Sequence, residues 1–157
     1  MKNIGIIALG NPFKKDDGIG ILLLEKLQKE KFFFPLDIDF IDCGTIGMNL
    51  IAVISQYDNV IVIDAVDFDK KPGYYKLFKL EDAQINDNEE AISIHNPDIL
   101  KILKFSKKIN KKPKKIFIFG VQPKNIEFGD NISEELKNSL NIIYINLKNE
   151  IMSILKK

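Results

Sequence analysis

The sequence predicts an α/β/α sandwich, in which helices cover both faces of a mostly parallel β-sheet. Two observations predict it: short, almost wholly apolar runs that end in turn-forming residues, and amphipathic stretches of helical spacing that follow these runs along the chain. Apolar runs of this kind are typical of strands buried on both faces, as in parallel sheets. The length of 157 residues suits one domain, and we expect a single domain over residues 1–157.

Five segments are predicted as strands. The first, Ile4 to Leu9, is rich in β-branched residues and ends in a Gly-Asn-Pro turn. Asp37 to Asp42 begins with alternating polar and apolar residues, and Val60 to Asp64 is an apolar run closed by a carboxylate. The other two segments are Gly73 to Leu80 and Ile116 to Phe119.

Four segments are predicted as helices. Gly18 to Lys31 is amphipathic, and Asp17 precedes it at the position of an N-cap. A short helix is expected from about Gly47 to Gln56. Pro97 to Phe105 starts with proline at the first helical position, where its missing N–H costs nothing. Ser133 to Leu155 starts with serine followed by two glutamates, which suits the positive end of the helix dipole.

The composition disfavours several classes of protein. All 23 basic residues are lysines and 22 residues are acidic, so no overall field attracts nucleic acid or an anionic membrane. Without arginine, phosphoryl-transfer chemistry based on guanidinium groups is excluded. A single cysteine and the absence of a signal-peptide or membrane-spanning apolar run lead us to expect a cytoplasmic protein.

In parallel sheets, ligands bind beyond the carboxyl ends of the strands. Four segments occupy such positions here: Gly10 to Asp17, Asp42 to Thr45, Asp64 to Asp67, and Gly120 to Pro123. We therefore expect the functional side chains in these segments.

The glycines of the first of these segments do not predict a nucleotide site. The spacing of Gly10, Gly18 and Gly20 departs from G-x-G-x-x-G, and no Gly-Lys-Ser/Thr triplet exists. Asp16 and Asp17 would also repel a pyrophosphate at the start of the following helix. This acidic loop suits a cation better.

The only histidine, His95, is a candidate metal ligand. Asp17 and Asp64 follow predicted strands, so the fold can bring two carboxylates together with the imidazole. Three protein ligands with open positions are typical of catalytic metal sites. The alternative is that Asp17 merely caps its helix and Asp64 accepts hydrogen bonds from loop amides, and the residues alone leave both interpretations open.

A thiol mechanism is a weaker alternative. Cys43 and His95 would be its nucleophile and base, but a small buried cysteine is the commoner role for such a residue. Asp42, Gly44 and Thr45 are expected to shape a supporting loop, with the aspartate accepting hydrogen bonds from nearby amides.

Several short motifs occur along almost the whole chain. They are, in order, Gly10-Asn11-Pro12, Asp16 to Gly20, Asp42 to Thr45, Ile63 to Asp67 with Pro72-Gly73, His95, and Gly120 to Pro123. Each is weak alone, but the ordered set is specific. It resembles the hydrogenase maturation proteases, the endopeptidases that remove the C-terminal extension from the large-subunit precursor of nickel-iron hydrogenases.

The resemblance implies a five-stranded mixed sheet in which the first and third strands are neighbours and one strand is antiparallel. It also implies that Asp17, Asp64 and His95 are the catalytic, metal-contacting residues of an aspartic-type endopeptidase. Some members carry glutamate at the first of these positions. Because aspartate is shorter, Asp16 remains an alternative to Asp17.

The resemblance further implies that the nickel is supplied by the bound precursor rather than held tightly by this protein, and that only loaded precursor is cleaved. The expected partner is the hydrogenase large-subunit precursor, with no nucleic acid or membrane partner, and a monomer is the expected state. The alternative is a fold relative that acts as a general metal-dependent peptidase or a metal-binding protein. The lysine-rich segment Lys107 to Lys115 is expected to be a solvated loop rather than a contact for the precursor.

Overall fold

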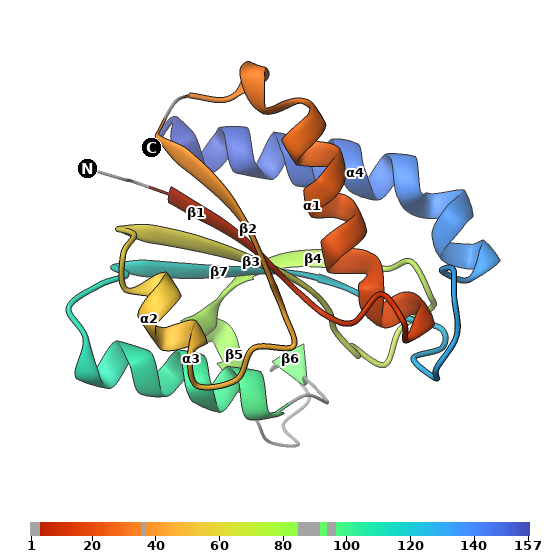
Figure 1. The fold of residues 1–157 in the computed structure, drawn as a ribbon, viewed down its shortest axis with the longest axis horizontal. Helices are drawn as coiled ribbons and strands as arrows, with labels where there is room; N and C mark the ends of the chain where they lie inside the picture. The colour runs from red at the N-terminus through yellow and green to blue at the C-terminus, as the bar shows by residue number, and fades with distance from the viewer. Residues whose placement is uncertain (1–3, 36, 85–91, 94–96) are drawn as a thin grey trace.

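The computed structural model describes residues 4–35, 37–84, 92–93 and 97–157. It has a five-stranded sheet with helices on both faces (Figure 1), as the sequence predicts. The strands of this sheet are β1 (Ile4–Leu9), β2 (Ile38–Gly44), β3 (Asn59–Ala65), β4 (Tyr75–Lys79) and β7 (Lys115–Val121). The helices are α1 (Ile19–Lys29), α2 (Leu50–Ile54), α3 (Pro97–Ile109) and α4 (Glu134–Leu155).

The strand order is β2-β1-β3-β7-β4. The first four strands are parallel to their neighbours, and β4 pairs with β7 in the antiparallel sense. Strand β2, which follows β1 along the chain, pairs with one edge of β1, whereas β3 pairs with the other edge. The carboxyl ends of β1 and β3 therefore flank the topological switch point, where α/β sheets bind ligands.

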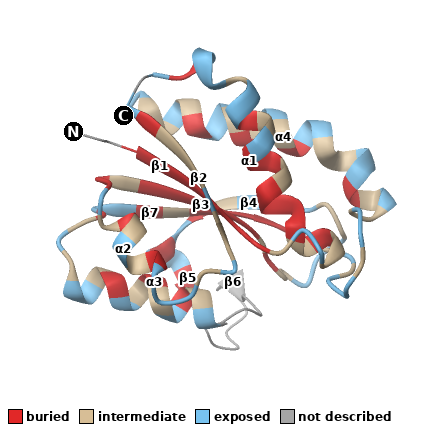
Figure 2. Cartoon of the chain, viewed as in Figure 1, coloured by how far each residue is buried: buried red, intermediate tan, exposed pale blue. Residues whose placement is uncertain are grey.

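Successive side chains of a strand point to opposite faces of the sheet, so the core has two layers, one on each face. Buried residues are coloured red in Figure 2. On β1, Ile4 and Ile6 pack under α1 and α4. Ile7 and Leu9 face the opposite way and pack with α2 and α3. Burial of both sheet faces explains why the central strands are nearly continuous apolar runs.

Helix α1 begins directly over the switch point. Gly20 in its first turn lies so close to the sheet that a Cβ there would stand 2.5 Å from the Ile63 carbonyl oxygen and 2.7 Å from that of Leu9. The glycine thus allows the start of α1 to contact the ends of β1 and β3.

The prediction that Asp17 is the N-cap of α1 is wrong. Lys15–Gly18 forms a 3₁₀ turn, η1, and the N-cap is Gly18, which makes no side-chain capping bond. The Asp17 carboxylate instead accepts a hydrogen bond from the Asn11 N–H. By contrast, Ser133 does cap α4, since its side chain accepts a hydrogen bond from the Leu136 N–H.

Three further details differ from the prediction. The lysine-rich segment is only partly a loop, because α3 extends to Ile109 and Lys112 forms an ion pair with Asp58 at 3.0 Å. The helix α2 is shorter than expected. A parallel pair of two-residue strands, β5 (Ala83–Gln84) and β6 (Ile92–Ser93), was not predicted. Two further 3₁₀ turns are η2 (Lys31–Phe33) and η3 (Leu80–Asp82).

Candidate active site

A cavity of about 230 Å³ lies at the carboxyl edge of the sheet, on the side of α2 and α3. Its walls come from the ends of β1 and β3, the loop after β2 and the first turns of α3. The residues that line it are Leu9, Gly10, Asp17, Gly44, Thr45, Ile46, Gly47, Asp64, Asp98, Ile99 and Ile102. Two of the predicted site residues, Asp17 and Asp64, thus share one cavity.

Asp64 is the buried carboxylate of this site. It follows Val60 and Val62 with strand periodicity, so its side chain points to the same face as their buried side chains. The side chain is largely shielded from water, with the residue 8% exposed. Burial, together with the negative charge of Asp17, raises the pKa of the Asp64 carboxyl to about 8, and a hydrogen bond from the Ala65 backbone opposes the shift only in part.

Asp17 is held in the cavity by the loop that follows β1. Its Oδ2 accepts a hydrogen bond from the Asn11 N–H at 2.9 Å. Gly10 makes this arrangement possible, since it has φ +130° and a Cβ there would stand 2.0 Å from the Asp17 carbonyl oxygen and 3.9 Å from Asp64 Oδ1. Gly10 therefore fits between the two acids, where a larger residue would displace the loop.

Asp16 has a different role from its neighbour. It is fully buried, and its two carboxylate oxygens accept bonds from the backbone N–H groups of Lys124, Asn125 and Ser133 and from the Ser133 hydroxyl. These bonds tie η1 to the segment that leads into α4. Asp17, not Asp16, is the first-loop acid that lines the cavity.

The loop after β2 has the expected hydrogen bond from a nearby amide to Asp42. Asp42 Oδ1 accepts a hydrogen bond from the Gly44 N–H at 2.9 Å, and Gly44 has φ +49°. The Gly44 carbonyl in turn accepts from the Gly10 N–H at 2.9 Å, which joins this loop to the one that carries Asp17. Thr45 follows and lines the cavity.

Cys43 has the character of a core residue. It is half-buried and packs against the apolar layer beneath α2 and α3. Burial and the nearby Asp42 raise the pKa of its thiol, so the reactive thiolate is disfavoured at neutral pH.

Sequence reasoning missed one acid of the site, Asp98. It lies in the first turn of α3, it is exposed, and it lines the cavity with Asp17 and Asp64. Its position three residues after His95 was the available signal. His95 itself lies outside the described residues.

The motif from Gly120 to Pro123 has a structural explanation. Gln122 is buried; its Oε1 accepts from the Phe68 N–H at 2.6 Å and its Nε2 donates to Asp67 Oδ1 at 3.1 Å. The side chain thereby fixes the loop that follows β3, and with it the chain just beyond Asp64.

The charged residues among the described lining of the cavity are the acids Asp17, Asp64 and Asp98, and no lysine lies among them. Among the described residues, no group of three or more His, Cys, Asp or Glu side chains is placed to hold a metal ion. Carboxylates in such a cavity suit an incoming cation. A nearby positive charge stabilises the ionised form of Asp64, and so offsets the effects of burial and of the Asp17 charge that keep Asp64 protonated. Within the same residues, no helix has the length and apolar character needed to span a membrane.

Comparison with known proteins gives consistent results. A profile of the hydrogenase maturation protease family matches residues 21–149. The hydrogenase expression/formation protein HoxM of Azotobacter vinelandii is 30% identical over 139 residues, which are 88% of this chain and 67% of HoxM. HupM of Azotobacter chroococcum has the same identity, and the chain spans about two thirds of both relatives.

Solved structures share the fold. The hydrogenase maturating endopeptidase HybD of E. coli superposes with a TM-score of 0.74 at 22% identity, over 96% of this chain and 93% of HybD. The [NiFe] hydrogenase maturation protease HycI of Thermococcus kodakarensis gives 0.70 at 24% identity, over 99% and 94%. The profile match covers most of the chain and agrees with the ordered motifs, so this chain belongs to the hydrogenase maturation protease family, a family of endopeptidases.

Proposed function

We propose that this protein removes the C-terminal extension of a nickel-iron hydrogenase large-subunit precursor after nickel insertion, and that it recognises the nickel already bound to that precursor. Asp17, Asp64 and His95 are the proposed contacts to the metal and the catalytic residues. The observation that carries the proposal is the pair of carboxylates, Asp17 and Asp64, in one cavity at the switch point, with no lysine among the described residues that line it.

The charge of the site explains why loaded precursor would be preferred. At neutral pH the buried Asp64 holds a proton, because burial and the charge of Asp17 raise its pKa to about 8. A divalent cation carried by the substrate favours the ionised carboxylate, so docking of the loaded form releases that proton. Metal-free precursor brings no such charge and leaves Asp64 protonated.

The same residues account for the hydrolysis. Substrate-bound nickel would polarise the scissile carbonyl or a water molecule. Asp17 is kept in place at the cavity by the Asn11 N–H. Asp64, once ionised, accepts a proton from the attacking water. A thiol route is disfavoured, since the pKa of Cys43 is raised. The enzyme is accordingly of the aspartic type.

The test compares metal-free with nickel-loaded precursor, and mass spectrometry follows loss of the C-terminal peptide. We expect cleavage of the loaded form only. A chelator added before nickel insertion should block cleavage, whereas a chelator added after insertion should not, because the precursor thiolates already hold the ion.

The Asp64→Asn and His95→Ala variants serve as inactive controls, with circular dichroism to verify the fold. Equal cleavage rates for the two precursor forms would overturn the proposal and favour a general metal-dependent peptidase. That alternative also predicts stoichiometric metal in the purified protein and activity on casein, neither of which we expect.

The proposed place of action is the cytoplasm. The single cysteine, half-buried and without a disulfide, is compatible with a reducing compartment. The precursor is the proposed partner.

A further inference from the structure

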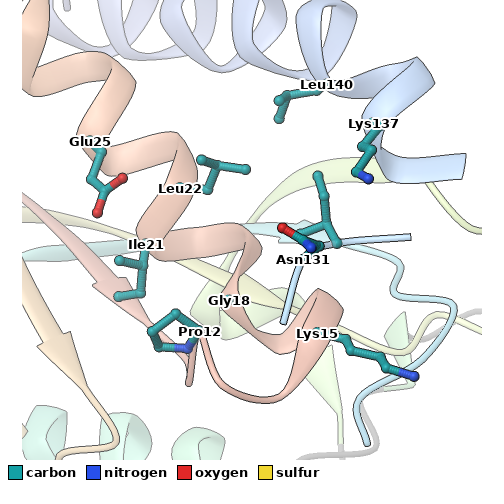
Figure 3. A pocket seen from close by; sticks show the side chains of 10 residues that line it. Pro12, Lys15, Gly18, Ile21, Leu22, Glu25, Asn131, Lys137 and Leu140 are labelled. Carbon is teal, nitrogen blue, oxygen red and sulfur yellow. The ribbon is translucent and has the colours of Figure 1, made fainter. Parts of the chain in front are cut away.

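A second cavity, of about 350 Å³, lies between α1 and the beginning of α4 (Figure 3). Its walls include Pro12, Gly18 and Lys15 from the same loop and turn that carry Asp17. The catalytic cavity opens on the side of α2 and α3, and this second pocket opens on the side of α1 and α4. One loop therefore separates the two.

The body of the pocket is apolar. Leu22 on α1 lies toward Leu140 on α4 (Figure 3), and Ile21 lines the pocket nearer to Pro12. Leu22 and Leu140 remain half-buried although they border the core. Incompletely covered leucines between two helices offer a site for one further apolar side chain. Burial of such a side chain favours binding by roughly 25 cal/mol per Å² of apolar area removed from water.

The charges are separated along the pocket. Lys15 and Lys137 lie at one end and Glu25 at the other (Figure 3). Lys137 contacts Glu134 at 3.2 Å, but this pair is exposed, and exposed pairs contribute about 0–1 kcal/mol. Lys15 makes no ion pair within the described part of the chain. The lysine end is thus complementary to a carboxylate.

Backbone conformation also marks this pocket. Lys15 has φ +46° and Asn131, which lines the same pocket, has φ +60°. Residues other than glycine persist in the left-handed region only where the surroundings hold them, often at binding sites. Here the Lys15 N–H donates to the Gly129 carbonyl at 3.1 Å, and a Cβ at Gly129 would stand 2.7 Å from Lys15 Cε, so the lysine stem packs against this glycine.

The loop between the two cavities carries exposed aromatic surface. Phe13 is 69% and Phe128 is 80% exposed. Their segments are joined by the hydrogen bond from the Gly129 N–H to the Phe13 carbonyl, at 2.9 Å. Exposed apolar side chains grouped beside a site are typical of surfaces that bind another chain. A substrate chain that leaves the catalytic cavity can cross this surface to reach the pocket.

We propose that the pocket between α1 and α4 binds the C-terminal extension of the precursor, with one apolar side chain between Leu22 and Leu140 and a carboxylate at Lys15 and Lys137. This inference rests on the proposed function. The pocket holds one or two side chains of an extended segment rather than a folded surface. The carboxylate belongs either to an acidic side chain of the extension or to its C-terminus.

The test is a charge reversal, Lys15→Glu with Lys137→Glu. We expect the KM for nickel-loaded precursor to rise at least tenfold and kcat to change less than twofold, because neither lysine touches the reacting atoms. Lys111→Glu with Lys114→Glu is the matched control. It makes the same total charge change at two exposed positions before β7, at the opposite edge of the sheet, and should leave KM unchanged.

Changes in the precursor distinguish the parts of the extension. Amidation of its C-terminus should raise KM if the terminal carboxylate is bound, and neutralisation of its acidic side chains should raise KM if one of these is bound. Replacement of its apolar residues by serine, one at a time, should identify one position that raises KM.

Binding of a fluorescein-labelled extension peptide, followed by anisotropy, separates this inference from the proposed function. Weaker binding to the double variant than to the wild type supports the pocket whether or not cleavage occurs. If the wild type cleaves loaded precursor and the double variant shows the same KM and peptide affinity, the pocket assignment is overturned and the proposed function stands. If the wild type leaves loaded precursor intact, the proposed function fails, and equal peptide affinities would then reject the pocket as well.

Discussion

Asp16 and Asp17 are adjacent in sequence, but their carboxylates belong to different parts of the structure. Asp16 is fully buried and accepts bonds from Ser133 and the segment before it, whereas Asp17 lines the cavity that contains Asp64. The 3₁₀ turn between β1 and α1 places the two side chains in these separate environments. One acid thus stabilises the loop, and the other is available for chemistry.

This division predicts opposite effects for two similar variants. The Asp16 carboxylate is a charged acceptor of four hydrogen bonds, and Asp16→Asn replaces one of its oxygens with an NH₂ group that can only donate. We therefore expect a loss of about 3 kcal/mol in the free energy of unfolding. At this chain length the melting temperature should fall by about 6–12 °C. Asp17→Asn should change stability by less than about 0.5 kcal/mol and lower kcat/KM on loaded precursor by on the order of 100-fold.

Calorimetry and the processing assay together check this pair. If Asp16→Asn were stable but inactive and Asp17→Asn remained active, the roles assigned to the two acids would be reversed.

Gly10 is expected to tolerate no side chain. In Gly10→Ala the new methyl group would stand 2.0 Å from the Asp17 carbonyl oxygen, at a φ of +130° that alanine rarely adopts. We expect a loss of more than about 2 kcal/mol in stability and displacement of the loop that holds Asp17. Gly47→Ala is the control, since Gly47 also lines the cavity but has nothing within 4 Å of an added Cβ. Urea unfolding of both variants measures the difference, and equal midpoints would contradict the steric argument.

Cys43→Ser should remain active. The thiol is half-buried with a raised pKa, so it is mostly protonated at neutral pH and a poor nucleophile. We expect kcat/KM on loaded precursor to stay within about threefold of the wild type, and iodoacetamide to leave cleavage intact. Complete loss of cleavage in a folded Cys43→Ser protein would instead support the thiol mechanism.

The central fold was predictable from the sequence because its strands are buried on both faces. Val60 to Asp64 and Ile116 to Phe119 are too apolar and too short for surface helices, and each lies within an observed strand. The pair β5 and β6 was not predictable, because strands of two residues depend on tertiary pairing rather than on a local pattern.

The candidate site was predictable only in part. Because ligands bind beyond the carboxyl ends of parallel strands, the sequence indicated Asp17 and Asp64, and the structure places both in one cavity. It did not separate Asp16 from Asp17, since the partners of Asp16 lie more than 100 residues away in sequence. Asp98 was missed because an acid in the first turn of a helix is usually explained by the helix dipole alone.

Asp64 should make the stability of the protein depend on pH. Its folded-state pKa is raised to about 8, from an ordinary value near 4, so the folded protein binds a proton that the unfolded chain releases between these values. The contribution of Asp64 to stability is therefore fully present below about pH 4 and is lost as the pH rises toward 8, by at most about 1.4 kcal/mol per pH unit.

The Asp64→Asn variant removes this titration while keeping the size of the side chain. We expect the variant to have nearly the stability of the wild type at pH 4 and to be increasingly more stable than it from pH 5 to pH 8, although it no longer processes precursor. Thermal unfolding across this pH range measures the gap between the two proteins. Parallel curves would mean that Asp64 is ionised in the folded state with an ordinary pKa, and the proton release proposed on docking of loaded precursor would then have no source.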